Sequence, residues 1–128
     1  MSSIKLLLDT NALLWILAGD PRFAPIARQA TIQADEVLVS DASLWEIAIK
    51  VSIKKLAPIP ELYEAIRRLG FKRLHIEEAH LQLIQTLPLI HRDPFDRMLV
   101  AQAHCEQAAL VTGDTLLKDY GIMIVAAL

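Results

Sequence analysis

The chain has 128 residues, 54% of them hydrophobic and 22% charged, with a formal net charge of −2 at pH 7. This length predicts one domain over residues 1–128 with a substantial core, and the composition excludes a disordered protein. The charge points to no strongly electrostatic partner, no apolar run is long enough to span a bilayer, and an acid interrupts MSSIKLLLD too early for a signal peptide.

Short apolar runs alternate along the chain with segments whose apolar residues recur at helical spacing. Glycines and prolines, such as Gly19, Gly70 and the APIP segment at 57–60, mark the ends of several helices. Strands that alternate with helices favour an α/β fold with a mostly parallel sheet. In chain order we predict strand 4–9, helix 11–18, helix 22–34, strand 36–40, helix 43–56, helix 61–70, strand 71–76, helix 77–88, helix 94–107, strand 109–112, helix 115–121 and strand 122–126.

The helix that begins within HRDPFDRMLVAQA (91–103) follows an unusually charged segment. Asp93 is a typical N-cap, Pro94 suits the first helical position, and Asp96 stands where a capping-box acid would stand. Capping explains this segment when it is taken alone, and we assign Asp93 to capping. For Asp96, binding of a cation is a second explanation that depends on the other acids of the chain.

Three further acids mark the ends of predicted strands or the start of the helix that follows. Asp9 ends the first strand, Asp114 follows strand 109–112 by one glycine, and Glu46 lies early in the helix after strand 36–40. The carboxyl ends of parallel strands share one sheet edge, where open α/β sheets bind ligands. We therefore expect these carboxylates to converge, joined by Asp96 if its helix starts at the same edge. Clustered carboxylates repel one another unless a cation neutralises them, and oxygen ligands select Mg²⁺ or Mn²⁺.

Each of these acids also has an ordinary structural explanation. Asp9 could cap helix 11–18, and Asp114 could be a turn or N-cap residue. The segment Ser43-Leu44-Trp45-Glu46 matches a capping box, and Glu46 could form an i,i+4 pair with Lys50. Capping does not explain why acids mark the same edge of the sheet repeatedly.

Four segments together resemble the PIN-domain family, and within it the VapC-like toxin ribonucleases of bacterial type II toxin–antitoxin pairs. They are LLLDTNALLW at 6–15, VSDASLWEIAIK at 39–50, HRDPFDRMLVAQA at 91–103 and LVTGDTLLKDYG at 110–121. The resemblance implies a PIN-like three-layer α/β/α sandwich with a mostly parallel sheet of four to five strands. It also carries the family's acidic metal site and catalytic residues onto Asp9, Glu46, Asp96 and Asp114.

The resemblance further implies a metal-dependent endoribonuclease that hydrolyses RNA phosphodiesters and leaves a 5′-phosphate. Mg²⁺ would be the cofactor, with Mn²⁺ able to substitute, and Asp9 and Asp96 would hold the ion most directly. The implied partners are RNA, a cognate antitoxin and a second copy of the chain, with no membrane. The family's polar residues match Thr10, Asn11 and Thr112, which would position the carboxylates or the phosphate but could also be ordinary turn residues. Arg92 and Arg97 are candidates for substrate positioning because they lie beside the acids in the sequence.

Several other residues that often carry function are interpreted as structural. Trp15 and Trp45 could be base-stacking platforms, but they lie on apolar helical faces, so we predict that they belong to the core. His91 could contact RNA, but we interpret it as a solvated loop residue. The only cysteine, Cys105, predicts a small core residue in a reduced, cytoplasmic protein.

Two other classes of protein compete with the nuclease. A receiver-type signalling domain also binds Mg²⁺ on an α/β fold, but it needs an acidic pair after the first strand and an aspartate in mid-chain. Here one aspartate follows the first strand, and KVSIKKLAPIP at 50–60 contains none. A non-catalytic PIN-like interaction domain would keep the same motifs, so cleavage of RNA must separate it from a nuclease.

Overall fold

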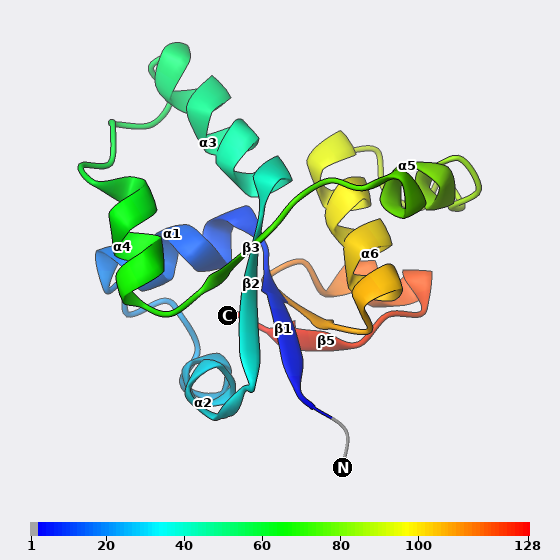
Figure 1. Cartoon of the computed structure of the whole chain (residues 1–128), viewed down its shortest axis with the longest axis horizontal. Helices are drawn as coiled ribbons and strands as arrows, with labels where there is room; N and C mark the ends of the chain where they lie inside the picture. The colour runs from blue at the N-terminus through cyan, green and yellow to red at the C-terminus, as the bar shows by residue number, and fades with distance from the viewer. Residues whose placement is uncertain (1–2) are drawn as a thin grey trace.

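The computed structural model describes residues 3–128 and builds them around one five-stranded sheet (Figure 1). The strands pair in the order β3-β2-β1-β4-β5, and every pair is parallel. The predicted α/β fold with its parallel sheet is therefore confirmed. In chain order the elements are β1 (Lys5–Leu8), α1 (Thr10–Ala18), α2 (Pro25–Gln33), β2 (Glu36–Ser40), α3 (Asp41–Ser52), α4 (Leu62–Arg68), β3 (Lys72–Leu74), α5 (Glu78–Ile84), α6 (Pro94–Glu106), β4 (Ala109–Thr112), the 3₁₀ helix η1 (Thr115–Tyr120) and β5 (Ile124–Ala126).

The central strand β1 separates two apolar cores. Leu6 and Leu8 point into a core formed with α1, α2, α3 and α4, whereas Leu7 points into a core formed with α6 and η1. Figure 1 shows α1, α2 and α4 on one side of the sheet and α5 and α6 on the other. A parallel strand buried on both faces reads as a continuous apolar run, which is why KLLL contains no alternation. The predicted three layers follow from this arrangement.

Two helix boundaries differ from the prediction for local reasons. Helix α3 begins at Asp41, earlier than expected, because the Ser40 hydroxyl at the end of β2 accepts the Ala42 backbone N–H at 3.0 Å. It ends at Ser52, and Lys54 closes it in the left-handed region with φ of 60°. Helix α5 ends at Ile84 rather than near residue 88. The segment after it is held from outside: the Arg97 guanidinium donates to the Pro88 carbonyl at 3.0 Å.

The strand order creates a crevice at one place. The chain builds β1, β2 and β3 toward one edge and then crosses over to add β4 and β5 on the other side of β1. The connections that leave the carboxyl ends of β1 and β4 therefore diverge, and open α/β sheets bind ligands at such a switch point. Asp9 follows β1 and Asp114 follows β4 by one glycine, so both acids lie at this crevice.

Two predictions about buried residues are wrong. Cys105 is exposed near the end of α6, and Trp45 has 61% of its surface exposed, because each side chain lies off the buried face of its helix. Trp15 is partly buried and packs against the core, as expected. Across residues 3–128, no helix combines the length and the apolar character needed to cross a bilayer.

Candidate functional site

Asp9 is both a helix cap and a buried member of an acidic group. Its Oδ1 accepts the Ala12 backbone N–H at 2.7 Å, so the capping interpretation is correct. Yet the residue is only 7% exposed, which a cap does not require. Burial raises the pKa of the Asp9 carboxyl, a hydrogen bond from Thr112 and the cap oppose this, and the charges of Glu46 and Asp114 raise it further. The carboxylate is thus held where other carboxylates destabilise its charge.

Asp96 is not needed to cap its own helix. Asp93 caps α6 by accepting the backbone N–H groups of Phe95 at 2.8 Å and Asp96 at 3.1 Å, which confirms the assignment of Asp93. Among residues 3–128, none donates a hydrogen bond to the Asp96 carboxylate. Burial raises the pKa of Asp96 to about 7, and the neighbouring charges of Asp93, Asp9 and Glu46 contribute to the rise while His91 opposes it. Its carboxylate is therefore free for an external cation.

Asp114 completes this side of the group and is oriented from three directions. Its Oδ1 accepts the Leu116 N–H at 3.1 Å, so it also caps η1, and its own N–H donates to the Thr112 hydroxyl at 3.0 Å. Its Oδ2 lies 2.9 Å from His91 Nε2. Thr112, which is fully buried, therefore positions both Asp9 and Asp114.

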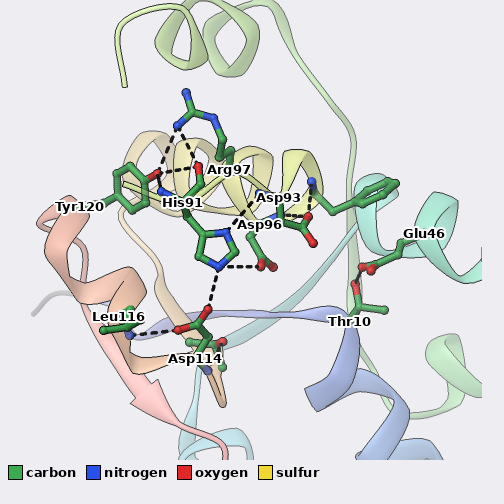
Figure 2. Close-up of polar contacts among 11 residues, drawn as sticks. Thr10, Glu46, His91, Asp93, Asp96, Arg97, Asp114, Leu116 and Tyr120 are labelled. Atoms are coloured by element: carbon green, nitrogen blue, oxygen red, sulfur yellow. Dashed lines mark hydrogen bonds and ion pairs between the residues drawn. The ribbon is translucent and has the colours of Figure 1, made fainter. Parts of the chain in front are cut away.

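His91 was interpreted as a solvated loop residue, and that interpretation is wrong. Figure 2 shows its ring pointing at Asp114 and Asp96, with Nε2 2.9 Å and 3.8 Å from the two carboxylates. The Asp93 backbone N–H, which can only donate, lies 3.2 Å from His91 Nδ1. Nδ1 must therefore accept, and the proton of the neutral ring sits on Nε2. In this arrangement His91 Nε2 donates to Asp114 and only lies near Asp96, so His91 is not placed to be a metal ligand.

Glu46 approaches the group from α3. The Thr10 hydroxyl donates to its Oε1 at 2.5 Å, and Lys50 Nζ lies 3.2 Å from its Oε2, which confirms the i,i+4 pair (Figure 2 shows the Thr10 contact). The capping-box interpretation is wrong, because Ser40 and not Ser43 caps α3. Within the described chain, the buried Ser43 hydroxyl has no hydrogen-bond partner.

The acids share an open cavity of about 440 Å³. Asp9, Asp96 and Asp114 line it together with the exposed side chain of Asn11, whereas Glu46 does not line it but acts on Asp9 and Asp96 through its charge. We call the four carboxylates the acidic cluster: Asp9, Glu46, Asp96 and Asp114. One ring nitrogen of His91 and one carboxylate oxygen each of Asp96 and Asp114 lie within 4.8 Å of one another.

The donor set of this cavity suits a hard divalent cation. Every carboxylate offers oxygen, two of them have raised pKa values because of burial and mutual repulsion, and Asp96 lacks a protein donor among the described residues. A cation would remove the repulsion that these carboxylates exert on one another. The acidic cluster could therefore hold such an ion.

The two arginines predicted beside the acids differ in what they do. The Arg97 guanidinium donates to Pro88 O at 3.0 Å and to the Tyr120 hydroxyl at 3.2 Å, so it holds the loop after α5 (Figure 2 shows the Tyr120 contact). Arg92 is exposed and, over residues 3–128, forms no hydrogen bond or ion pair. Arg92 is thus the arginine whose charge is available to an external group.

The chain is similar to known proteins over most of its length. The PIN domain family model matches residues 6–122. Ribonuclease VapC22 of Mycobacterium tuberculosis is 30% identical over 121 residues, covering 89% of this chain and 90% of that protein. The DNA-bound VapBC complex of Salmonella typhimurium shares the fold with a TM-score of 0.72 at 20% identity, covering 98% of this chain and 99% of that chain. VapC20 of Mycobacterium tuberculosis, a toxin that cleaves the sarcin-ricin loop, has a TM-score of 0.67 at 16% identity, covering 94% and 98%. The family model spans most of the chain, and this protein belongs to the PIN-domain family.

Proposed function

We propose that this protein is a metal-dependent endoribonuclease and the toxin of a type II toxin–antitoxin pair. The observation that carries the proposal is the meeting of Asp9, Asp96 and Asp114 in one cavity at the switch point of the sheet, with Glu46 near enough for its charge to act on Asp96. The relative that is 30% identical over nearly the whole chain is a ribonuclease, and VapC20, which shares the fold, cleaves RNA. Membership of the PIN-domain family argues against the receiver-type alternative.

In the proposed reaction, RNA phosphodiesters are hydrolysed and a 5′-phosphate is left. Asp9 and Asp96 would hold Mg²⁺ most directly, Asp114 and Glu46 would complete the shell or orient water, and Mn²⁺ would substitute. A bound ion of this kind supplies an activated water and neutralises charge that develops on the phosphate. The acids are the catalytic residues of this proposal.

The chain's own residues prepare the cluster for this task. Thr112 orients Asp9 and Asp114 together, and Thr10 orients Glu46, so the carboxylates need not reorganise when a cation arrives. Asn11, exposed at the cavity, would meet the phosphate. Asp96, with a pKa of about 7, gives up its proton as it gains a cation, which makes ion binding pH-dependent.

The partners that we propose are RNA, an antitoxin whose tail covers the acidic cavity, and a second copy of the chain. The Salmonella structure of the same fold is a VapBC complex bound to DNA, which supports a protein partner of the antitoxin kind. We place the activity in the cytoplasm, where RNA is met. Purification from the native host should then recover a small second protein, and a chain that emerges alone, nontoxic and fully active would contradict the toxin assignment.

The decisive experiment is cleavage-site mapping on total RNA with purified, antitoxin-free protein. We expect Mg²⁺-dependent cuts at defined sites with 5′-phosphate ends, and no cuts in EDTA. Cleavage that persists in EDTA would contradict metal dependence. Binding of RNA without any cleavage, in Mg²⁺ or Mn²⁺, would favour the non-catalytic interaction domain instead.

A further inference from the structure

Beside the acidic cavity lies a second cavity that the proposed mechanism does not use. Its volume is about 460 Å³, within the range of roughly 300–1,000 Å³ typical of small-molecule sites. Its walls come from the first turns of α3 and α6 and from the chain that follows α5. We call it the aromatic cavity, after Trp45 and Phe95. Arg92 and Arg97 also line it, and the other lining residues are apolar: Ala42, Ile76, Ile84, Leu89, Pro94 and Met98.

The aromatic cavity and the acidic cluster are built on the same two helical turns. On α3, Trp45 comes directly before Glu46, and on α6, Phe95 comes directly before Asp96. Successive residues of a helix point about 100° apart. The acid of each pair therefore faces the cluster while its aromatic neighbour faces the aromatic cavity. A nucleic acid with one phosphate at the cluster would therefore bring an adjoining nucleotide toward these two rings.

Trp45 is held in place yet left open. Its ring contacts Phe95 with centroids 5.4 Å apart and planes at 75°, an edge-on contact that leaves an indole face uncovered by Phe95. The side chain remains 61% exposed, which is unusual for the largest apolar residue type. The backbone of Phe95 is fixed by the Asp93 cap at 2.8 Å. The pair thus forms a rigid aromatic surface on which a planar group can stack.

The charge at the rim of the aromatic cavity matches a phosphodiester. Arg92 is exposed and, within the described residues, has no acidic or carbonyl partner, whereas Arg97, which also lines the cavity, donates its hydrogen bonds to the loop carbonyls. An apolar protein segment would leave the Arg92 charge without a partner. A nucleotide offers both a ring for Trp45 and a phosphate for Arg92.

We propose that the aromatic cavity is a nucleobase subsite, in which Trp45 stacks on the base beside the scissile phosphate and Arg92 binds the adjoining phosphate. The proposal rests on the proposed ribonuclease function and adds to it a determinant of base preference. Stacking on Trp45 selects by ring size and shape, so the preference concerns one nucleotide position next to the cut. Arg92 contributes affinity without sequence information.

The test uses a random-sequence RNA pool whose fragment ends are sequenced, together with kcat and KM on one cleaved oligonucleotide. Trp45→Ala should lower kcat/KM roughly 5- to 150-fold, mainly through KM, and flatten the base preference at one position beside the cut. Trp45→Phe should keep that preference. Arg92→Ala should weaken all sequences alike and reduce the salt dependence. Ile32→Ala, an exposed residue of α2 on the other face, should match wild type.

The outcomes separate failure of the subsite from failure of the ribonuclease proposal. If wild type cleaves RNA and Trp45→Ala shows the same kcat/KM and base profile, the subsite is refuted and the ribonuclease stands. If Trp45→Ala instead only dissociates a homodimer in analytical ultracentrifugation, the cavity belongs to an interface and the proposal is overturned.

If wild type cleaves nothing, binding decides the subsite alone. Fluorescence anisotropy would compare a labelled ten-nucleotide RNA of mixed sequence with a strand of the same length that lacks its bases. The subsite predicts tighter binding of the base-bearing strand and loss of that difference in Trp45→Ala. Equal binding of the two strands by wild type would refute it.

Discussion

Helix α6 passes through two groups of polar side chains, and they are organised in opposite ways. At its first turn, Asp96 belongs to the acidic cluster, where the neighbours of a carboxylate are other carboxylates. Farther along, Gln102 and Glu106 belong to a second group, in which donors meet acceptors. We call this second group the buried network, made of Ser40, His80, Gln102 and Glu106.

The polar groups of the buried network form hydrogen bonds with one another or with the backbone. The Ser40 hydroxyl donates to Gln102 Oε1 at 2.6 Å, and His80 Nε2 lies 3.2 Å from Glu106. The other ring nitrogen of His80, which is 1% exposed, accepts the Glu77 backbone N–H at 3.0 Å. Burial of polar atoms alone therefore does not mark a site in this protein. The acidic cluster differs because Asp96 has no hydrogen-bond donor among the described residues and because its neighbours Asp9 and Glu46 are carboxylates too, whose mutual repulsion a cation would remove.

The largest expected effect separates the two groups by activity. Asp96→Asn should lower RNA cleavage by at least about a hundredfold, because even residues that only support metal ligands cost 10- to 100-fold when changed. Initial rates at saturating Mg²⁺ would measure it. Gln102→Ala, at a buried position of the same helix, should stay close to wild type per folded molecule. Near wild-type cleavage by Asp96→Asn would remove Asp96 from the site.

Asp93→Asn is the matched control for this variant. It removes a carboxylate three residues away on the same helix turn, and asparagine caps a helix about as well as aspartate. Cleavage by Asp93→Asn should therefore remain near wild type. A comparable loss in both variants would show that any charge change at this turn disturbs the reaction, which would contradict a specific role for Asp96.

A second prediction concerns what a cation does to stability. Mg²⁺ at about a hundred times its Kd should stabilise wild type by roughly 2.7 kcal/mol, which raises the melting temperature by several degrees. Asp9→Asn keeps the cap but should lose most of this gain and should melt higher than wild type in EDTA, since one repelling buried charge is gone. Wild type and variant, each melted in EDTA and in Mg²⁺, measure it. Four superimposable curves would mean that Asp9 only caps α1 and does not bind a cation.

A substitution in the buried network should lower the stability of the protein and leave its response to Mg²⁺ unchanged, which is the opposite of what Asp9→Asn should do. Gln102→Ala leaves the buried Ser40 hydroxyl without its acceptor, so we expect a loss of about 1–3 kcal/mol in the free energy of unfolding, read from urea denaturation. The stabilisation by Mg²⁺ should persist. A double-mutant cycle with Ser40→Ala should give a coupling of roughly 0.5–3 kcal/mol. Additive effects would show that the two side chains do not depend on each other.

Features of the two groups that depend on local sequence or on the parallel topology could be predicted from the sequence, whereas those that depend on contacts between distant residues could not. Asp9 and Asp114 directly follow buried apolar strands, and parallel topology alone brings such positions to one edge, so their meeting is foreseeable. Asp93 and the elements around it follow from local capping and periodicity. Both cores likewise follow from the apolar runs of β1, β2 and β4, which a parallel sheet buries on two faces, whereas the strand order was not predicted from the sequence.

The features that sequence reasoning missed are set by the loop after α5. Its path depends on Arg97 binding carbonyl groups and on the Tyr120 hydroxyl, which lies 2.8 Å from the His91 N–H, and no local pattern encodes these contacts. That loop turns His91 toward the acids and forms a wall beside Trp45. One signal was present: a histidine two residues before a capped helix with Asp at its third position. Only its combination with Asp114, distant in sequence, gives it meaning.

The smallest expected effect is a pH dependence that only the acidic cluster should show. The Asp96 carboxyl has a pKa of about 7 when folded, because it is buried among acids, and about 3.9 in an unfolded chain. Between these values the folded protein binds a proton that the unfolded chain does not. The free energy of unfolding of the metal-free protein should therefore fall as pH rises from about 4 to about 7. Asp9, whose pKa is raised by burial as well, adds in the same direction.

Melting temperatures of wild type and Asp96→Asn in EDTA, between pH 5 and pH 8, measure this dependence. Groups common to both proteins cancel in the difference, so wild type should lose stability relative to the variant up to about pH 7 and then run parallel to it. In Mg²⁺ the trend reverses: wild type should gain stability relative to the variant as pH rises, because the cation competes with the proton and binds wild type more tightly at higher pH. The variant of the buried network, Gln102→Ala, should follow wild type in both conditions. Parallel curves for wild type and Asp96→Asn across the whole range would mean that Asp96 is already ionised at pH 5. Burial and repulsion between the acids would then not raise the pKa of Asp96.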